Sequence, residues 1–202
     1  MRFTTSLSAL LLGSLLLANG VAGEKFEIDA SHSNVLFTVR HMVIAKVTGK
    51  FKDFSGTIIY DEKDLSQSSV NVTIKVASID TENEARDKHL RSEDFFNAAQ
   101  DSLITFTSRK IEKRGEGFVA VGDLTMRGVT KEIVLPFTLL GTIKDPWGNK
   151  RLAVEARTTI NRFDYGVKWD KTLEGGNLIV GKEVEVNLNI EAIAKPAQAP
   201  KL

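Results

Sequence analysis

The sequence predicts an all-β domain of about eight antiparallel strands with one short helix inserted between them. Apolar and polar residues alternate with a period of two over long stretches, most clearly at residues 70–76 and 184–190. Segments rich in glycine, aspartate and asparagine separate these stretches at short intervals. Because strands joined by short turns pair as antiparallel hairpins, neighbours in the sequence should also be neighbours in the sheet.

Weaker alternation marks the other strands and gives each of them one apolar face. These strands are expected at residues 35–39, 47–60, 104–106, 118–126, 133–139 and 152–160. Turn residues lie between them at 61–64, 114–117, 127–128 and 145–149. Such strands bury their apolar faces by closing into a barrel, which leaves no exposed edge, or by forming a two-sheet sandwich. We favour the barrel and keep the sandwich as the alternative.

One segment departs from the two-residue period. Thr81 and Glu84 have the spacing of a capping box, in which the two side chains satisfy free backbone N–H groups at the start of a helix. We therefore expect a short helix over residues 85–90, followed by the adjacent aromatics Phe95 and Phe96. The inserted element as a whole covers residues 82–96.

The chain begins with the pattern of a secretory signal peptide. Arg2 precedes an apolar run at residues 7–18, and small residues follow up to Gly23. We expect residues 1–23 to be removed after Ala22 or Gly23 and the protein to be periplasmic; an uncleaved membrane anchor is the alternative. Residues 24–194 then form one domain. Residues 195–202 contain two prolines and no periodicity, so we expect a disordered tail.

Charge and cysteine content exclude several function classes. Loss of the signal segment removes Arg2 and no acidic residue, which leaves equal numbers of basic and acidic residues. A neutral protein has no overall electrostatic field that would attract nucleic acid or hold the protein stably at an anionic membrane. The chain has no cysteine, so neither disulfides nor a lipidated cysteine can be expected.

The histidines do not predict a metal site. They are His32, His41 and His89. The first two are separated by nine residues of one extended segment, which places them about 30 Å apart. Their odd spacing also directs them to opposite faces, so we expect structural histidines and no metal.

No motif for phosphate binding or nucleophilic catalysis is complete. Residues 176–182 match a phosphate-binding loop up to Lys182, but Glu183 stands where serine or threonine is required, and a strand follows instead of a helix. There is no Gly-x-Ser-x-Gly elbow and no cysteine nucleophile. We therefore expect no enzymatic activity and no cofactor.

The apolar strand faces are rich in phenylalanine. The chain has 11 phenylalanines against two tyrosines and two tryptophans, a bias toward aromatic rings without a polar group. A barrel of about eight strands is either filled by its side chains or just wide enough for one small ligand. The composition fits both an ordinary packed core and a tunnel for a hydrophobic chain.

Six sequence blocks, in one order, carry a family pattern. They are SHSNVLFTVRH at 31–41, GKFKDFSG at 49–56, SIDT at 78–81, RDKHLRSEDFF at 86–96, GDLTMRGVTK at 122–131 and NRFDYG at 161–166. Together they resemble the YceI family of lipocalin-like, polyisoprenoid-binding proteins over residues 24–194. Tyr165 departs mildly from the family pattern Arg-x-Asp-Phe-Gly.

The resemblance implies an extended eight-stranded antiparallel lipocalin-like barrel that holds a polyisoprenoid or related long-chain amphiphilic lipid, such as a prenylated quinone, without catalysis. Family members are typically exported and several form dimers, so the resemblance leaves open whether this chain is a monomer or a homodimer. Residues placed along the lipid tail are Phe37, Val39, Phe106, Leu124, Met126, Leu135, Phe137 and Ile160. Residues placed at the mouth are Phe51, Phe54, Phe95, Phe96, Phe163 and Tyr165. Candidates for the polar head group are Arg86, His89 and Arg162, each of which also fits a solvated or structural role.

Two other function classes stay open at this point. The barrel could be a solidly packed structural or partner-binding module of the cell envelope without a lipid ligand. It could also be an enzyme that acts on a bound isoprenoid, although no catalytic motif supports this.

Overall fold

The structure is a computed structural model that describes residues 23–195. The expected signal peptide, except for Gly23, and residues 196–202 of the expected tail lie outside the described residues. The strands are β1 (Glu24–Ile28), β2 (Asn34–His41), β3 (Ala45–Phe51), β4 (Phe54–Tyr60), β5 (Ser69–Lys75), β6 (Ile79–Asp80), β7 (Leu103–Arg114), β8 (Gly117–Met126), β9 (Val129–Lys144), β10 (Lys150–Asn161) and β11 (Val180–Ala194). The helices are α1 (Glu84–Arg91) and the short 3₁₀ turns η1 (Leu65–Gln67), η2 (Val76–Ser78) and η3 (Arg162–Tyr165).

The strands form a closed antiparallel barrel, as the sequence predicts. The wall runs in the order β1-β4-β5-β7-β8-β9-β10-β11 and closes where β1 pairs with β11. Only the end of β11 pairs with β1, through residues such as Ala192 and Ala194, whereas most of β11 pairs with β2. Strands β1 and β2 therefore act as one wall strand that is broken at residues 29–33. Closure excludes the sandwich alternative.

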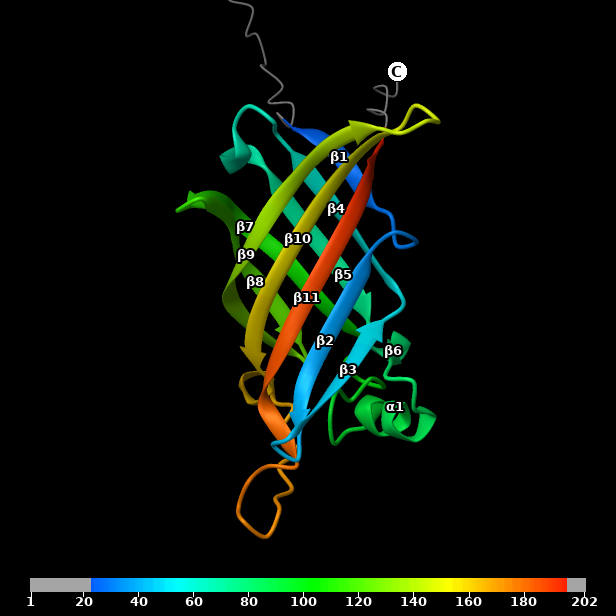
Figure 1. Cartoon of the computed structure of the whole chain (residues 1–202), viewed down its shortest axis with the longest axis vertical. Helices are drawn as coiled ribbons and strands as arrows, with labels where there is room; N and C mark the ends of the chain where they lie inside the picture. The colour runs from blue at the N-terminus through cyan, green and yellow to red at the C-terminus, as the bar shows by residue number, and fades with distance from the viewer. Residues whose placement is uncertain (1–22, 196–202) are drawn as a thin grey trace, which may run out of the picture.

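The expected strand at residues 47–60 is interrupted at Lys52 and Asp53, which separate β3 from β4. The Asp53 carbonyl accepts a backbone hydrogen bond from Lys75, and its side chain forms a salt bridge with the Lys75 ammonium at 2.8 Å. The end of β3, before the break, pairs with β6, whereas β4, after the break, pairs with β5. Figure 1 shows α1 and β6 beside β3 at this end of the barrel, opposite the end where the described chain begins and finishes.

The short helix lies where it is expected, but its cap differs. Asn83, and not Thr81, is the N-cap residue, and its side chain accepts a hydrogen bond from the Arg86 N–H. The Thr81 backbone N–H and hydroxyl instead donate to Oδ1 of Asp87, and both residues are buried. Thr81 therefore bonds to Asp87 and does not cap the helix, so the predicted capping box of Thr81 and Glu84 is wrong.

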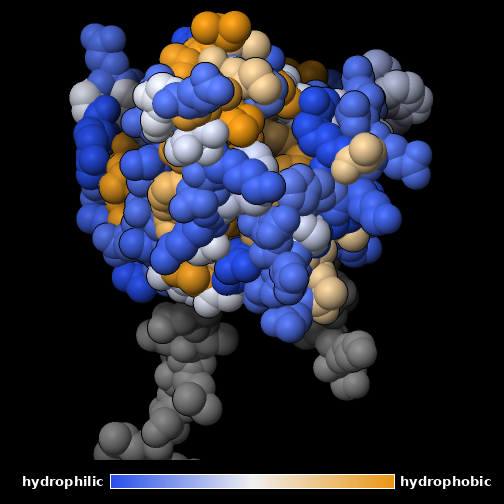
Figure 2. Space-filling view, turned by 90° about the horizontal axis from the view of Figure 1, so that it is seen from below, coloured by the Kyte–Doolittle hydropathy of each residue, from blue (hydrophilic) through white to orange (hydrophobic). Residues whose placement is uncertain are grey.

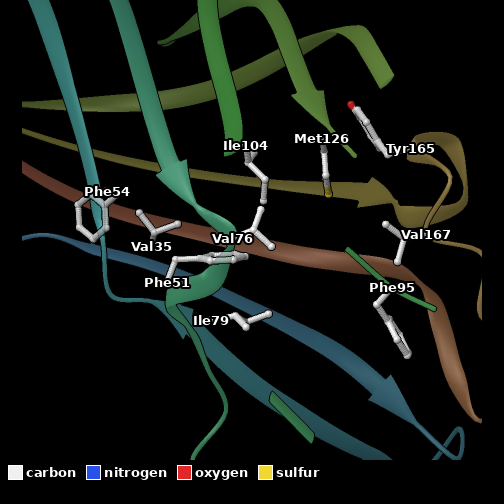
Figure 3. Close-up of a cluster of buried hydrophobic side chains, with 10 residues drawn as sticks. All are labelled: Val35, Phe51, Phe54, Val76, Ile79, Phe95, Ile104, Met126, Tyr165 and Val167. Atoms are coloured by element: carbon white, nitrogen blue, oxygen red, sulfur yellow. The ribbon is translucent and has the colours of Figure 1, made fainter. Parts of the chain in front are cut away.

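Buried apolar side chains gather in three clusters. The largest cluster lies at the α1 end and includes Phe51, Phe95 and Tyr165. Figure 3 shows Phe51 near Val76 in this cluster. A second cluster, of Phe26, Leu152 and Ala192, lies at the other end of the wall, where β1 meets β11. The third cluster, of Phe106, Ile111 and Ala120, lies on β7 and β8, and half-buried side chains of β5 and β9 such as Val70 and Leu135 pack against it.

The surface of the described residues is mostly hydrophilic at the α1 end, with a few exposed apolar side chains (Figure 2). Within residues 23–195, no helix has the length and apolar character needed to cross a membrane. Hydrophilic side chains cover much of the α1 end, and hydrophobic ones gather at one edge of it (Figure 2). The turn between β2 and β3 exposes Met42, Val43 and Ile44.

Candidate functional site

A cavity with a volume of about 270 Å³ lies inside the barrel. Every second residue of β10 from Leu152 to Ile160 lines it. At about 3.3 Å per residue, this stretch of strand is about 26 Å long. A volume of this size spread over such a length is a narrow channel, so its shape suits an extended chain better than a compact molecule.

The wall of the channel is made by the inward-facing residues of the period-two strands. On β9 these are Ile133, Leu135, Phe137 and Leu139, which alternate with exposed residues. Each of the four is only half-buried although it faces the interior of the barrel. Side chains that met in the middle of the barrel would bury one another, so this partial exposure is the mark of an open lumen.

Polar groups are sparse in the channel. Among the described residues that line it, the polar side chains are those of Tyr60, Ser68, Ser69, Thr158 and Arg162. Burial raises the pKa of the Tyr60 hydroxyl, so that this group stays neutral. None of the lining residues is a carboxylate, a histidine or a cysteine.

The structure brings together eleven of the fourteen apolar residues that the resemblance placed at the ligand. They are Phe37, Val39, Phe51, Phe95, Phe96, Phe106, Leu124, Met126, Leu135, Phe137 and Ile160. Their common position follows from strand alternation for the residues of the wall, and from the segment after α1 for Phe95 and Phe96.

Three of the fourteen lie outside the channel lining. Phe54 and Tyr165 are buried in the cluster at the α1 end, with exposed fractions of 7% and 2%. Phe54 is the first residue of β4, directly after the break at Lys52 and Asp53. Phe163 lies in η3 against cations, with its ring 4.5 Å from the Arg162 guanidinium and 5.5 Å from the Lys182 ammonium.

The lining also includes residues that were not singled out from the sequence. Val184, Val186, Leu188 and Ile190 of β11 face the channel. Further lining comes from Val70, Val72 and Ile74 of β5 and from Leu152, Val154 and Ala156 of β10. The same alternation that predicts these strands also gives their inward faces, so the signal was present in the sequence.

The three head-group candidates have different surroundings. Arg86 donates from Nε to the Thr81 hydroxyl and from Nη2 to the Thr81 carbonyl, and it does not line the channel. The His89 ring lies 2.8 Å from an Asp94 carboxylate oxygen on the surface and also lies outside the lining. Arg162 alone of the three lines the channel, and it is buried.

One group of side chains has the composition of a metal site. Asp29, His32 and Glu191 lie close enough to share an ion. Arg151 donates from Nη1 to both carboxylates and from Nε to Asp145 at 2.8 Å, so a guanidinium already neutralises this group. None of these residues lines the channel. The cluster connects Asp29, in the segment between β1 and β2, to Arg151 of β10 and Glu191 of β11.

The charges of this cluster change the acidity of its carboxyl groups. Hydrogen bonds from Ser31 and His32 hold the pKa of Asp29 well below its usual range. Burial raises the pKa of Asp145, but hydrogen bonds from Arg151 and Asn149 outweigh this effect and lower the pKa to about 2. Both groups are therefore strong stabilising partners of Arg151 only when they are ionised.

Comparisons with known proteins agree with this architecture. Residues 26–192 match the model of the YceI-like domain. Protein YceI of Escherichia coli O157:H7 is 42% identical over 168 residues, which cover 82% of this chain and 88% of that protein. The crystal structure of the Campylobacter jejuni YceI protein is similar with 34% identity and a TM-score of 0.67, over 78% of this chain and 90% of that one.

A more distant structure shows the same fold. It is that of a polyisoprenoid binding domain from Saccharophagus degradans implicated in plant cell wall breakdown, with 20% identity and a TM-score of 0.60 over 84% of this chain and 98% of that one. The family model spans nearly all of the described barrel. On this evidence, the chain belongs to the family of YceI-like domains.

Proposed function

We propose that the protein is a non-catalytic carrier or reservoir that holds one long-chain isoprenoid lipid or prenylated quinone in its barrel. The observation that carries this proposal is the narrow apolar channel along β10. Burial of apolar surface contributes about 0.8 kcal/mol per methylene. Each five-carbon isoprene unit then contributes about 3 to 4 kcal/mol before ordering costs, so a few units suffice for stable binding.

Two further observations support a lipid as the ligand. The S. degradans domain of the same fold is described as polyisoprenoid binding. The lining offers a long chain apolar contacts and few groups that a compact polar ligand would need. A solidly packed module would not leave lumen-facing residues such as Leu135 and Phe137 half-buried. An enzyme would need reactive groups at the channel, and the lining has no carboxylate, histidine or cysteine.

We place this function in the cell envelope. The support for this location is the signal-peptide pattern of residues 1–23, with its basic start and apolar run. An exported carrier would keep a water-insoluble chain out of water between membranes, and a chain without cysteine would not depend on the redox state of the compartment.

The proposal is tested by lipid extraction and by uptake. The protein is purified from its native envelope without detergent, extracted with organic solvent and analysed by mass spectrometry. We expect a long-chain isoprenoid in the extract, and we expect the delipidated protein to take up such a lipid from vesicles. A lipid-free protein that also fails to take up isoprenoids in vitro would contradict the proposal.

A further inference from the structure

The channel contains a single formal charge among its described lining residues, that of Arg162. This side chain is 5% exposed. Within residues 23–195, Arg162 forms no salt bridge, and Asp170 is the acidic residue whose charge acts on it from a longer distance. Burial of a cation without a directly paired carboxylate is costly, and this desolvation lowers the pKa of Arg162 although the charge of Asp170 opposes it.

Backbone carbonyls hold the guanidinium in place. Nε donates to the Gly181 carbonyl at 2.8 Å and Nη1 to the Val167 carbonyl at 2.6 Å. Nη2 donates to the carbonyls of Trp169 and Val180, at 2.7 and 2.9 Å. A guanidinium has five N–H groups, so these bonds leave one N–H of Nη1 without a protein acceptor among the described residues. The carbonyls offer partial charges and no formal negative charge.

The ring contacts of Arg162 also fix its position. Its guanidinium lies 4.5 Å from the centre of the Phe163 ring and 6.0 Å from that of Phe95, a residue that itself lines the channel. An arginine that is already immobilised loses little further freedom when a ligand binds. The arrangement therefore forms a preorganised cationic site at the α1 and η3 end of an otherwise apolar channel.

We propose that Arg162 binds an anionic, oxygen-bearing end group of the lipid, such as a phosphate. This inference rests on the proposed function and adds an orientation to it. The charged end lies toward η3, where one oxygen accepts the remaining N–H of Nη1, and the hydrocarbon chain runs along β10 toward Leu152. The polar side chains Tyr60, Ser68 and Ser69, which line the channel elsewhere, are neutral and offer no comparable attraction to an anion.

The test compares two lipids with the same chain. Delipidated protein is titrated with geranylgeranyl alcohol and with geranylgeranyl monophosphate, and both affinities are measured by competition with a fluorescent prenyl probe. We expect the monophosphate to bind about tenfold or more tightly than the alcohol, because a charge-assisted hydrogen bond is worth at least one decade of affinity.

Variants at two arginines connect this preference to the site. Arg162→Met should reduce the ratio of monophosphate to alcohol affinity to about one, whereas Arg162→Lys, which keeps the charge, should retain part of this preference. The matched control is Arg157→Met, because Arg157 is an exposed residue of β10 and its loss removes the same charge. This control should retain the full preference for the monophosphate. If Arg162→Met does not fold, the test rests on the ratio of monophosphate to alcohol affinity in the wild-type protein and in Arg162→Lys.

The outcomes separate this inference from the proposed function. Equal affinity of the wild-type protein for alcohol and monophosphate would overturn the assignment of Arg162 and leave the carrier function standing. A preference that persists in folded Arg162→Met would also overturn it. Failure of the wild-type protein to bind either lipid would overturn the carrier function itself.

Discussion

Gly49 faces Phe37 directly across the β2–β3 pair, and a Cβ atom built on Gly49 would lie 2.3 Å from Cζ of the Phe37 ring. The ring therefore lies over a position that only glycine leaves free. It also contacts Phe51, with ring centres 5.7 Å apart, and both rings line the channel. The shape of this part of the channel wall depends on the absence of a side chain at Gly49.

Replacement of Gly49 by alanine should therefore affect both stability and ligand uptake. The added methyl carbon would also lie 2.8 Å from Thr81 Cγ2, so the Phe37 ring and the Thr81 side chain would both have to move. We expect a loss of about 1 to 3 kcal/mol in the free energy of unfolding. We also expect weaker lipid uptake. Urea denaturation and an uptake assay measure the two effects.

Gly117→Ala is the control for this substitution. The nearest atom to a Cβ at Gly117 is the Phe137 carbonyl oxygen at 3.8 Å, an ordinary contact. Its unfolding free energy should stay within about 0.5 kcal/mol of wild type. Equal stability of the two alanine variants would contradict the tight packing of Phe37 on Gly49.

A tryptophan in the channel should block uptake without unfolding the barrel. Leu135 faces the lumen from β9, and Leu135→Trp would fill part of the open volume. We expect uptake to fall by about tenfold or more while stability changes by less than about 1 kcal/mol. Val134→Trp, on the outer face of the same strand, should leave uptake unchanged. Loss of folding in Leu135→Trp would instead indicate a barrel without free space.

Stability should fall in acid because Asp29 and Asp145 have a lowered pKa in the folded state. A carboxyl group of this kind stabilises the fold fully above its unfolded pKa. Its contribution is lost as the pH falls through the folded pKa, which is about 2 for Asp145. We therefore expect the urea midpoint to hold down to about pH 4 and to decline from there toward pH 2.

Arg151→Gln should lower the stability at neutral pH and make this acid decline smaller, because without the guanidinium the folded pKa of Asp145 rises toward its unfolded value. Arg109→Gln removes an exposed arginine that bridges Asp123 and Glu132, and such surface pairs contribute little. Its pH profile should follow that of wild type. Coincident profiles of all three proteins would rule out a special role for Arg151.

The cap of α1 gives a further test. Asn83→Ala should cost about 1 kcal/mol of unfolding free energy, because the Arg86 N–H loses its acceptor. Asn83→Ser keeps a capping oxygen and should cost much less. Both values come from urea denaturation. If the alanine and serine variants are equally stable, Asn83 does not cap this helix.

Much of the fold could be predicted from the sequence because a half-buried strand repeats every two residues. The alternation at 184–190 gave both a strand and the four residues of β11 that line the channel. The break between β3 and β4 left no such signal, because Lys52 and Asp53 are ordinary polar residues whose effect comes from backbone contacts with the segment 75–78.

The site was predictable in its wall and less so at its end. Strand phase places Phe37, Leu135 and Ile160 inside the barrel without knowledge of tertiary contacts. The positions of Tyr165 and Arg162 depend instead on how η3 folds back against β11, where Arg162 meets carbonyl groups 18 and 19 residues away in the chain. Helix capping failed for a similar reason, since Asp87 satisfies Thr81 only in the folded chain.

The central claim, that the barrel is hollow and holds one lipid chain, is tested most directly by native mass spectrometry of the intact protein from its own envelope. We predict one adduct per chain with the mass of a long-chain isoprenoid, absent from Leu135→Trp, together with the mass of the monomer or homodimer that carries it. The claim would be contradicted if the wild-type protein is detected only at its unliganded mass, both as purified and after incubation with isoprenoids.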